Sequence, residues 1–204
     1  MSEAVAAHHA LDVEPQESPL TPESWGKLGM WVFLAGDAMS FGGLIAAYAA
    51  LRIGDPNWPL PTEHLGIPLT AFMTFLLICS SVTMVKGLEA IQHGDQAGLR
   101  KFLGLTILGG SLFLAMQAYE WTHLILGSEH HAPLGLSTLF GATFFVLTGF
   151  HGCHVFSGVV YLTIILLNAG HYTKTDHNSV EIVGLYWHFV DLVWILIFTF
   201  VYLV

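Results

Sequence analysis

Residues 28–51 read LGMWVFLAGDAMSFGGLIAAYAAL, a run in which Asp37 is the only acidic or basic side chain. An α-helix rises about 1.5 Å per residue, so a run of this length can cross the roughly 30 Å hydrocarbon core of a bilayer. The stretch therefore predicts a transmembrane helix.

Four further apolar stretches of similar length follow. Only 10% of the 204 residues are charged, against about 25% in an ordinary soluble domain, and the mean hydropathy is +0.64. We predict an all-α integral membrane domain over residues 25–204 with five transmembrane helices, at about 28–51, 67–88, 102–126, 139–167 and 182–204. The six Lys and Arg residues are dispersed, which excludes the basic surface that binding of nucleic acid requires.

The first 24 residues differ from the rest, because they hold five acidic residues, three prolines and no Lys or Arg. This composition predicts a disordered acidic tail and does not fit a signal peptide. Basic residues predict the orientation, since they are enriched on the cytoplasmic side of membrane proteins. Arg52 falls at one end of the predicted bundle, and the other five fall at the N-terminal end: Lys27, Lys86, Arg100, Lys101 and Lys174. We expect a cytoplasmic N-terminus and tail, and a C-terminus outside.

Seven ionisable side chains fall inside the predicted spans, where each is costly unless it is buried and paired. They are Asp37, Glu120, His123, His151, His154, His188 and Asp191. Helical rise places all of them at similar depth in the inner half except Glu120 and His123, which fall near the outer interface. We predict a buried polar cluster that joins the helices by hydrogen bonds. Asp37 is in addition a candidate for proton handling, and the small residues Gly36, Ser40, Gly43 and Ala47 beside it predict a close helix contact.

The stretch FHGCHVFSG at residues 150–158 leaves a second interpretation open, because His151 and His154 share one face of a helix. His151 and His188 could be the two axial ligands of a haem, with room left by Gly149 and Gly152. Histidine and carboxylate ligands from the same cluster would also suit a metal ion. His154 and Asp191 would crowd a haem at this depth. We therefore favour hydrogen bonding, and expect no catalytic, cofactor-binding or metal-binding residue in this chain.

Motifs in all five spans resemble subunit III of the haem–copper terminal oxidases, the family of cytochrome c oxidase and quinol oxidase subunit 3, in its short five-helix bacterial form. They read, in the family's order, LGMWVFLAGDAMSF, FLLICSSVTM, QAYEWTHLI, FFVLTGFHGCHVFSG and GLYWHFVDLVWILIFTFVYL. The resemblance covers essentially residues 25–204 and leaves only the tail outside. HGxHVxxG and YWHFVDxVW together make it highly specific.

The resemblance implies an accessory, non-catalytic subunit of a proton-pumping oxidase that reduces O2 to water in aerobic respiration. Subunit III of this family holds no haem or copper, which belong to subunits I and II. It supports proton uptake, binds structural phospholipid and stabilises the catalytic subunit. The family's carbodiimide-reactive carboxylate, usually Glu, matches Asp37, and its other conserved polar groups match Glu120, His151, His154, His188 and Asp191.

The partners that the resemblance implies are oxidase subunits I and II, a small subunit IV and membrane lipids, in a hetero-oligomer of the bacterial cytoplasmic (inner) membrane. Either cytochrome c or quinol could supply the electrons, since that site lies on other subunits. Three alternatives stay open. They are a subunit-III-like protein associated with nitric oxide reductase, an independent haem-binding membrane cytochrome, and a small proton-coupled carrier that uses Asp37.

Overall fold

A computed structural model describes residues 25–56, 58–59, 65–127 and 138–203 of the chain. Five long helices make up most of this part, and each is long and apolar enough to cross a membrane. They are α2 (Trp25–Gly54), α4 (Ile67–Gln92), α5 (Gln96–Leu126), α6 (Leu139–Leu167) and α7 (Asn178–Ile197). A short 3-10 helix, η1 (Ala169–His171), follows α6, and a π-helical turn, η2 (Phe198–Leu203), continues α7. The prediction of five membrane helices is confirmed, while the predicted tail lies outside the described residues.

Local sequence explains where several helices begin. The side chain of Asp95 accepts a hydrogen bond from the Gly98 N–H at the start of α5, and Thr138 does the same for Gly141 at the start of α6. Such N-caps satisfy backbone donors that have no partner within the helix. Helix α5 begins six residues before the predicted span, because polar residues such as Arg100 lower the hydropathy but continue the helix.

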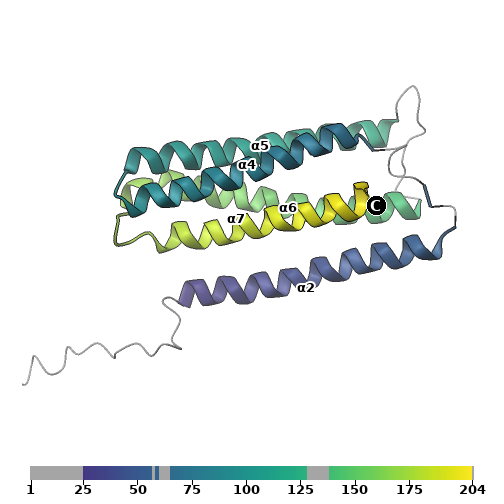
Figure 1. Cartoon of the computed structure of the whole chain (residues 1–204), viewed down its shortest axis with the longest axis horizontal. Helices are drawn as coiled ribbons and strands as arrows, with labels where there is room; N and C mark the ends of the chain where they lie inside the picture. The colour runs from purple at the N-terminus through teal and green to yellow at the C-terminus, as the bar shows by residue number, and fades with distance from the viewer. Residues whose placement is uncertain (1–24, 57, 60–64, 128–137, 204) are drawn as a thin grey trace, which may run out of the picture.

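Helices α4, α5, α6 and α7 pack as a bundle, and α2 lies at one side of it against α7 and α6 (Figure 1). Leu34, Phe41 and Tyr48 are the buried residues of α2, and their spacing of seven places them on one face. The predicted small-residue contact is wrong within this chain. Side chains at Gly36 or Gly43 would meet nothing within 4 Å, because the large side chains of α2 occupy the face toward the bundle.

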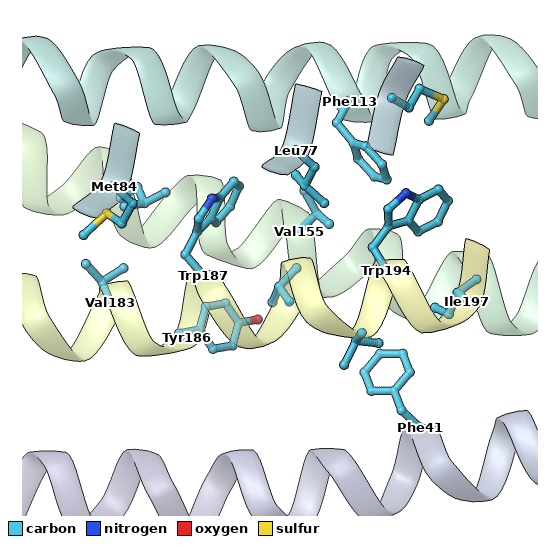
Figure 2. Packing of buried hydrophobic residues seen from close by; sticks show 14 of the residues in the cluster. Phe41, Leu77, Met84, Phe113, Val155, Val183, Tyr186, Trp187, Trp194 and Ile197 are labelled. Carbon is cyan, nitrogen blue, oxygen red and sulfur yellow. The ribbon is translucent and has the colours of Figure 1, made fainter. Parts of the chain in front are cut away.

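Two tryptophans of α7 fill the centre of the bundle. Figure 2 shows Trp187 and Trp194 on the side of α7 away from Phe41 of α2, and both indoles are fully buried. Their N–H groups donate to hydroxyls of α4, Trp187 to Ser80 at 3.1 Å and Trp194 to Thr74 at 2.9 Å. Burying a large ring while satisfying its N–H makes α7 a central element of the fold.

Candidate functional site

The most prominent polar contact between helices joins Asp37 of α2 to His154 of α6. Oδ2 of Asp37 lies 3.0 Å from Nε2 of His154, and the two side chains are 14% and 13% exposed. The Phe41 ring packs edge-on against the imidazole, with 5.2 Å between ring centres. The pair is therefore held in place and yet lies close to the surface of the bundle.

The contact of the second ring nitrogen of His154 determines how many protons the Asp37–His154 pair shares. Nδ1 lies 2.8 Å from the carbonyl oxygen of Phe150. A carbonyl can only accept, so Nδ1 carries a hydrogen. The hydrogen bond between Nε2 and Asp37 then contains one proton, which belongs either to the imidazole or to the carboxyl group. That proton can lie on either atom without a change in the position of either side chain.

Helix α7 reaches the same place through Tyr186. Its hydroxyl donates to the backbone oxygen of His154 at 3.0 Å and lies 2.6 Å from the hydroxyl of Ser157. The Ser157 hydroxyl also lies within hydrogen-bonding distance of the oxygen of His154, at 2.9 Å. These contacts fix the backbone that carries His154 and join α7 to α6 beside the Asp37–His154 pair. Tyr186 was not among the predicted site residues.

His188 and Asp191 form a second polar group, which meets α4 instead of α2. Nδ1 of His188 lies 3.3 Å from the Ser81 hydroxyl, and Asp191 lies beside the same serine. Ser81 was not among the predicted site residues. A serine in an apolar span gives little signal in sequence, because its partners lie 107 and 110 positions away along the chain.

His151 is fully buried among aromatic rings and, within the described residues, its ring nitrogens have no hydrogen-bond partner. It stacks on Trp194 with 4.9 Å between ring centres and meets Phe113 edge-on at 5.8 Å. These rings occupy the space beside the imidazole that a porphyrin would need. Trp121 and Gln117 of α5 pack against Gly149 and Gly152, at 3.0 and 3.2 Å from the Cβ positions, and the two glycines line a groove between α5 and α6.

Glu120 and His123, the two outer residues of the predicted cluster, lie apart from its other members and do not contact each other among the interactions of the described residues. Glu120 is buried and bonds to Thr70 and Tyr202, two residues that sequence reasoning did not single out. His123 is exposed, so its place in a buried cluster is wrong. His123 lies three residues after Glu120, on another face of α5, and its side chain packs against Tyr119 outside the bundle.

An ionic group that was not predicted joins the N-terminal ends of α2 and α7. Lys27 forms an ion pair with Glu181, which also contacts Nε2 of His177 at 3.0 Å. This group borders a groove of about 260 Å³ between α4 and α7 whose apolar lining includes Met84 and Leu185. A second groove, of about 310 Å³, lies between α5 and α6 and is lined mostly by apolar side chains.

Comparison with known proteins gives one consistent result. The family model described as cytochrome c oxidase subunit III matches residues 23–204. A cytochrome c oxidase subunit 3 from Synechocystis is 43% identical over 180 residues, which cover 86% of this chain and 74% of that protein. The corresponding protein of Corynebacterium diphtheriae is 39% identical, with 87% of each chain covered. That of Alkalihalophilus pseudofirmus is 32% identical over 100% of this chain and 98% of its own length.

Proposed function

Since this chain belongs to the cytochrome c oxidase subunit III family, we propose that it is an accessory subunit of a proton-pumping haem–copper oxidase. Haem and copper would lie in subunits I and II, and a small subunit IV would complete the complex. This chain would support proton uptake, hold structural phospholipid and stabilise subunit I. The observation that carries the proposal is the Asp37–His154 pair, a proton-holding site near the surface of a chain whose family forms part of an oxidase.

The proposed orientation places the Lys27–Glu181 ion pair on the cytoplasmic side of a bacterial inner membrane. Lys27, Arg100 and Lys174 lie at or beyond this end of the bundle, as the positive-inside rule requires, and Arg52 lies at the other. Protons for O2 reduction would then come from the side on which α2 begins. A fluorescent protein fused after residue 204 should stay dark outside, and an alkaline phosphatase fused there should be active; the reverse pattern would contradict this orientation.

The proton role of Asp37 is tested in the assembled oxidase with Asp37→Asn. The amide keeps the size of the side chain and can still bond to His154, but it cannot carry the exchangeable acid proton. We expect slower proton uptake and earlier loss of activity during turnover, with the haem spectrum unchanged. Ser40→Ala is the matched control, because the Ser40 hydroxyl bonds to Gly36 within α2 at 3.1 Å.

The result is interpretable only if the subunit remains bound, so the amount of this chain per haem is measured in the same samples. Full retention with wild-type proton uptake and wild-type lifetime would reject the proton role. Loss of the chain in Asp37→Asn alone would assign the pair to helix packing. Slower uptake with full retention supports the proposal.

The groove between α4 and α7 supports the proposed lipid role. The groove between α4 and α7 combines an apolar lining with the Lys27–Glu181 pair, a combination that complements an acyl chain below a charged headgroup. Phospholipid that co-purifies with the complex is measured by mass spectrometry. Leu185→Trp, which fills this groove, should lower the amount bound, while Leu196→Trp on an exposed part of α7 should not.

Assembly is tested by purifying the tagged chain from native membranes under gentle conditions. Near-equal amounts of a large haem–copper subunit and a subunit with a copper-binding domain would support the proposal, and their sequences would identify cytochrome c or quinol as the donor. Co-purification of a nitric oxide reductase would favour that alternative within the family. A haem spectrum in the stripped chain would contradict the accessory role.

A further inference from the structure

Glu120 is a buried acidic side chain for which the proposed function has no use. It is 4% exposed and lies on α5, near the end of the bundle opposite Lys27. Its Oε2 atom accepts a hydrogen bond from the Tyr202 hydroxyl at 3.0 Å, and Oε1 lies 3.0 Å from the hydroxyl of Thr70. Among the described residues these neutral groups are the hydrogen-bond partners of the carboxyl group.

The hydrogens in this group can be counted. Thr70 has one hydroxyl hydrogen, and its oxygen lies 3.2 Å from the Gly66 carbonyl, which can only accept. If Thr70 donates to Gly66, its oxygen is left to accept from Glu120, and Oε1 must then carry a hydrogen. In this arrangement the hydrogen bonds run in one direction, from the Tyr202 hydroxyl to Glu120, from Glu120 to Thr70, and from Thr70 to Gly66. Every hydroxyl then donates once.

An ionised Glu120 satisfies the same contacts less well. Thr70 would have to turn its hydroxyl hydrogen from Gly66, whose carbonyl also accepts the Thr70 N–H at 3.1 Å, toward Oε1 of Glu120. A full negative charge would then remain in the bundle beside two neutral donors. A buried charge without a cationic partner is costly in an apolar environment. The neutral acid avoids this cost and keeps all three hydrogen bonds.

Tyr202 belongs to the π-helical turn η2 at the end of α7. Its ring is 1% exposed and packs edge-on against Phe144 of α6, with 5.7 Å between ring centres. Phe200 and Leu203 on the same turn are exposed. The hydroxyl of Tyr202 is thus the polar contact through which this turn is joined to α5 and α4. We infer that Glu120 is a permanently neutral acid that fastens the C-terminal turn to the bundle, a role separate from proton uptake at Asp37.

Glu120→Gln and Glu120→Leu distinguish the neutral acid from a carboxylate. A glutamine amide has the hydrogen-bond pattern of a protonated acid, with an oxygen that accepts from Tyr202 and an N–H that donates to Thr70. A carboxylate only accepts, so the amide replaces it at both positions only if the Thr70 hydroxyl turns from Glu120 to Gly66. Leucine keeps much of the volume and removes both bonds. Tyr202→Phe removes one donor with little change in shape.

The test uses the complete oxidase and follows the release of C-terminal residues by carboxypeptidase. Loss of one buried hydrogen bond of about average strength predicts roughly fivefold faster release in Tyr202→Phe, and a larger increase in Glu120→Leu. Glu120→Gln should match the wild type. Glu89→Gln and Glu89→Leu are matched controls, because Glu89 is exposed and pairs with Lys86 on its own helix.

Each result decides the matter. Faster release in Glu120→Gln, or its failure to assemble, would show that a carboxylate is needed and would overturn the inference. Wild-type release in Glu120→Leu or in Tyr202→Phe would overturn the fastening role. Assembly of the glutamine variant where the leucine variant fails supports the inference. The infrared band of a protonated carboxyl group, present in the wild type and absent from Glu120→Gln, supplies an independent readout, and its absence from the wild type would overturn the neutral acid.

Discussion

Gly110→Ala tests how closely α5, α6 and α7 pack at the centre of the bundle. A Cβ atom at this position would overlap the six-membered ring of Trp187 and would lie 2.8 Å from Cγ2 of Val159. Trp187 is fully buried, and its N–H is bonded to Ser80 at 3.1 Å, so the indole cannot move without weakening a buried hydrogen bond. Overpacking of this kind costs about 1–3 kcal/mol.

We expect Gly110→Ala to lower the free energy of unfolding by about 2 kcal/mol, roughly a 30-fold change in the ratio of folded to unfolded chain. Gly104→Ala is the control on the same helix, because a Cβ atom there meets nothing within 4 Å. The measurement is the temperature at which half of this chain is lost from the purified oxidase. That temperature should fall for Gly110→Ala and should not fall for Gly104→Ala.

Combining Gly110→Ala with Trp187→Phe tests whether the effect of Gly110→Ala comes from overlap with the Trp187 ring. Phenylalanine does not reach as far toward α5, so Gly110→Ala should cost less in the Trp187→Phe background than in the wild type. Contacting residues show such coupling in a double-mutant cycle. Equal effects of Gly110→Ala in the two backgrounds, or equal effects of Gly110→Ala and Gly104→Ala in the wild type, would refute the packing argument.

Three further substitutions are followed with the same assay. Trp194→Phe should lower the loss temperature by an amount that corresponds to about 1 kcal/mol, because the bond to Thr74 is buried; Trp25→Phe, at an exposed position, is its control. His151→Leu should leave the temperature unchanged or raise it, since the imidazole has no hydrogen-bond partner among the described residues, and a fall as large as that of Trp194→Phe would contradict this. Glu181→Gln should cost at most about 1 kcal/mol and less at high salt, because its ion pair with Lys27 is partly exposed; a salt-independent effect would argue against an electrostatic origin.

The helices could be predicted because each span depends on its own composition. Runs of twenty or more apolar residues have few alternatives to a membrane helix, and the bounds of α6 agree with the predicted range 139–167. The other spans were predicted too short, by three residues at each end of α2 and by six at the start of α5. The length of an apolar run reflects the thickness of the hydrocarbon core. The helix itself continues into the membrane interface as long as its backbone is hydrogen-bonded and capped.

The partners of the polar residues could not be predicted to the same extent. Depth along a helix follows from residue number, so Asp37 and His154 could be expected at one level. The direction of a side chain around its helix depends on the neighbouring helix. His188 and Asp191 therefore turn toward Ser81 of α4, although their depth fits Asp37 equally well. The same holds for His151: its depth could be predicted, but the aromatic rings that surround it could not.

The way α2 is attached bears on how the proposed proton role of the Asp37–His154 pair can be separated from helix packing. Lys27 joins α2 to α7 at one end. Near the other end Tyr48 packs edge-on against Trp58, and Trp58 packs edge-on against Phe140 of α6, with 5.4 and 5.6 Å between ring centres. Between these two ends, Phe41 and the Asp37–His154 pair hold α2 to α6. Because hydrogen bonds between membrane helices are worth only about 0.6–2 kcal/mol each, loss of the pair alone should leave α2 in place. A functional defect of Asp37→Asn in a fully assembled oxidase would then reflect the missing proton.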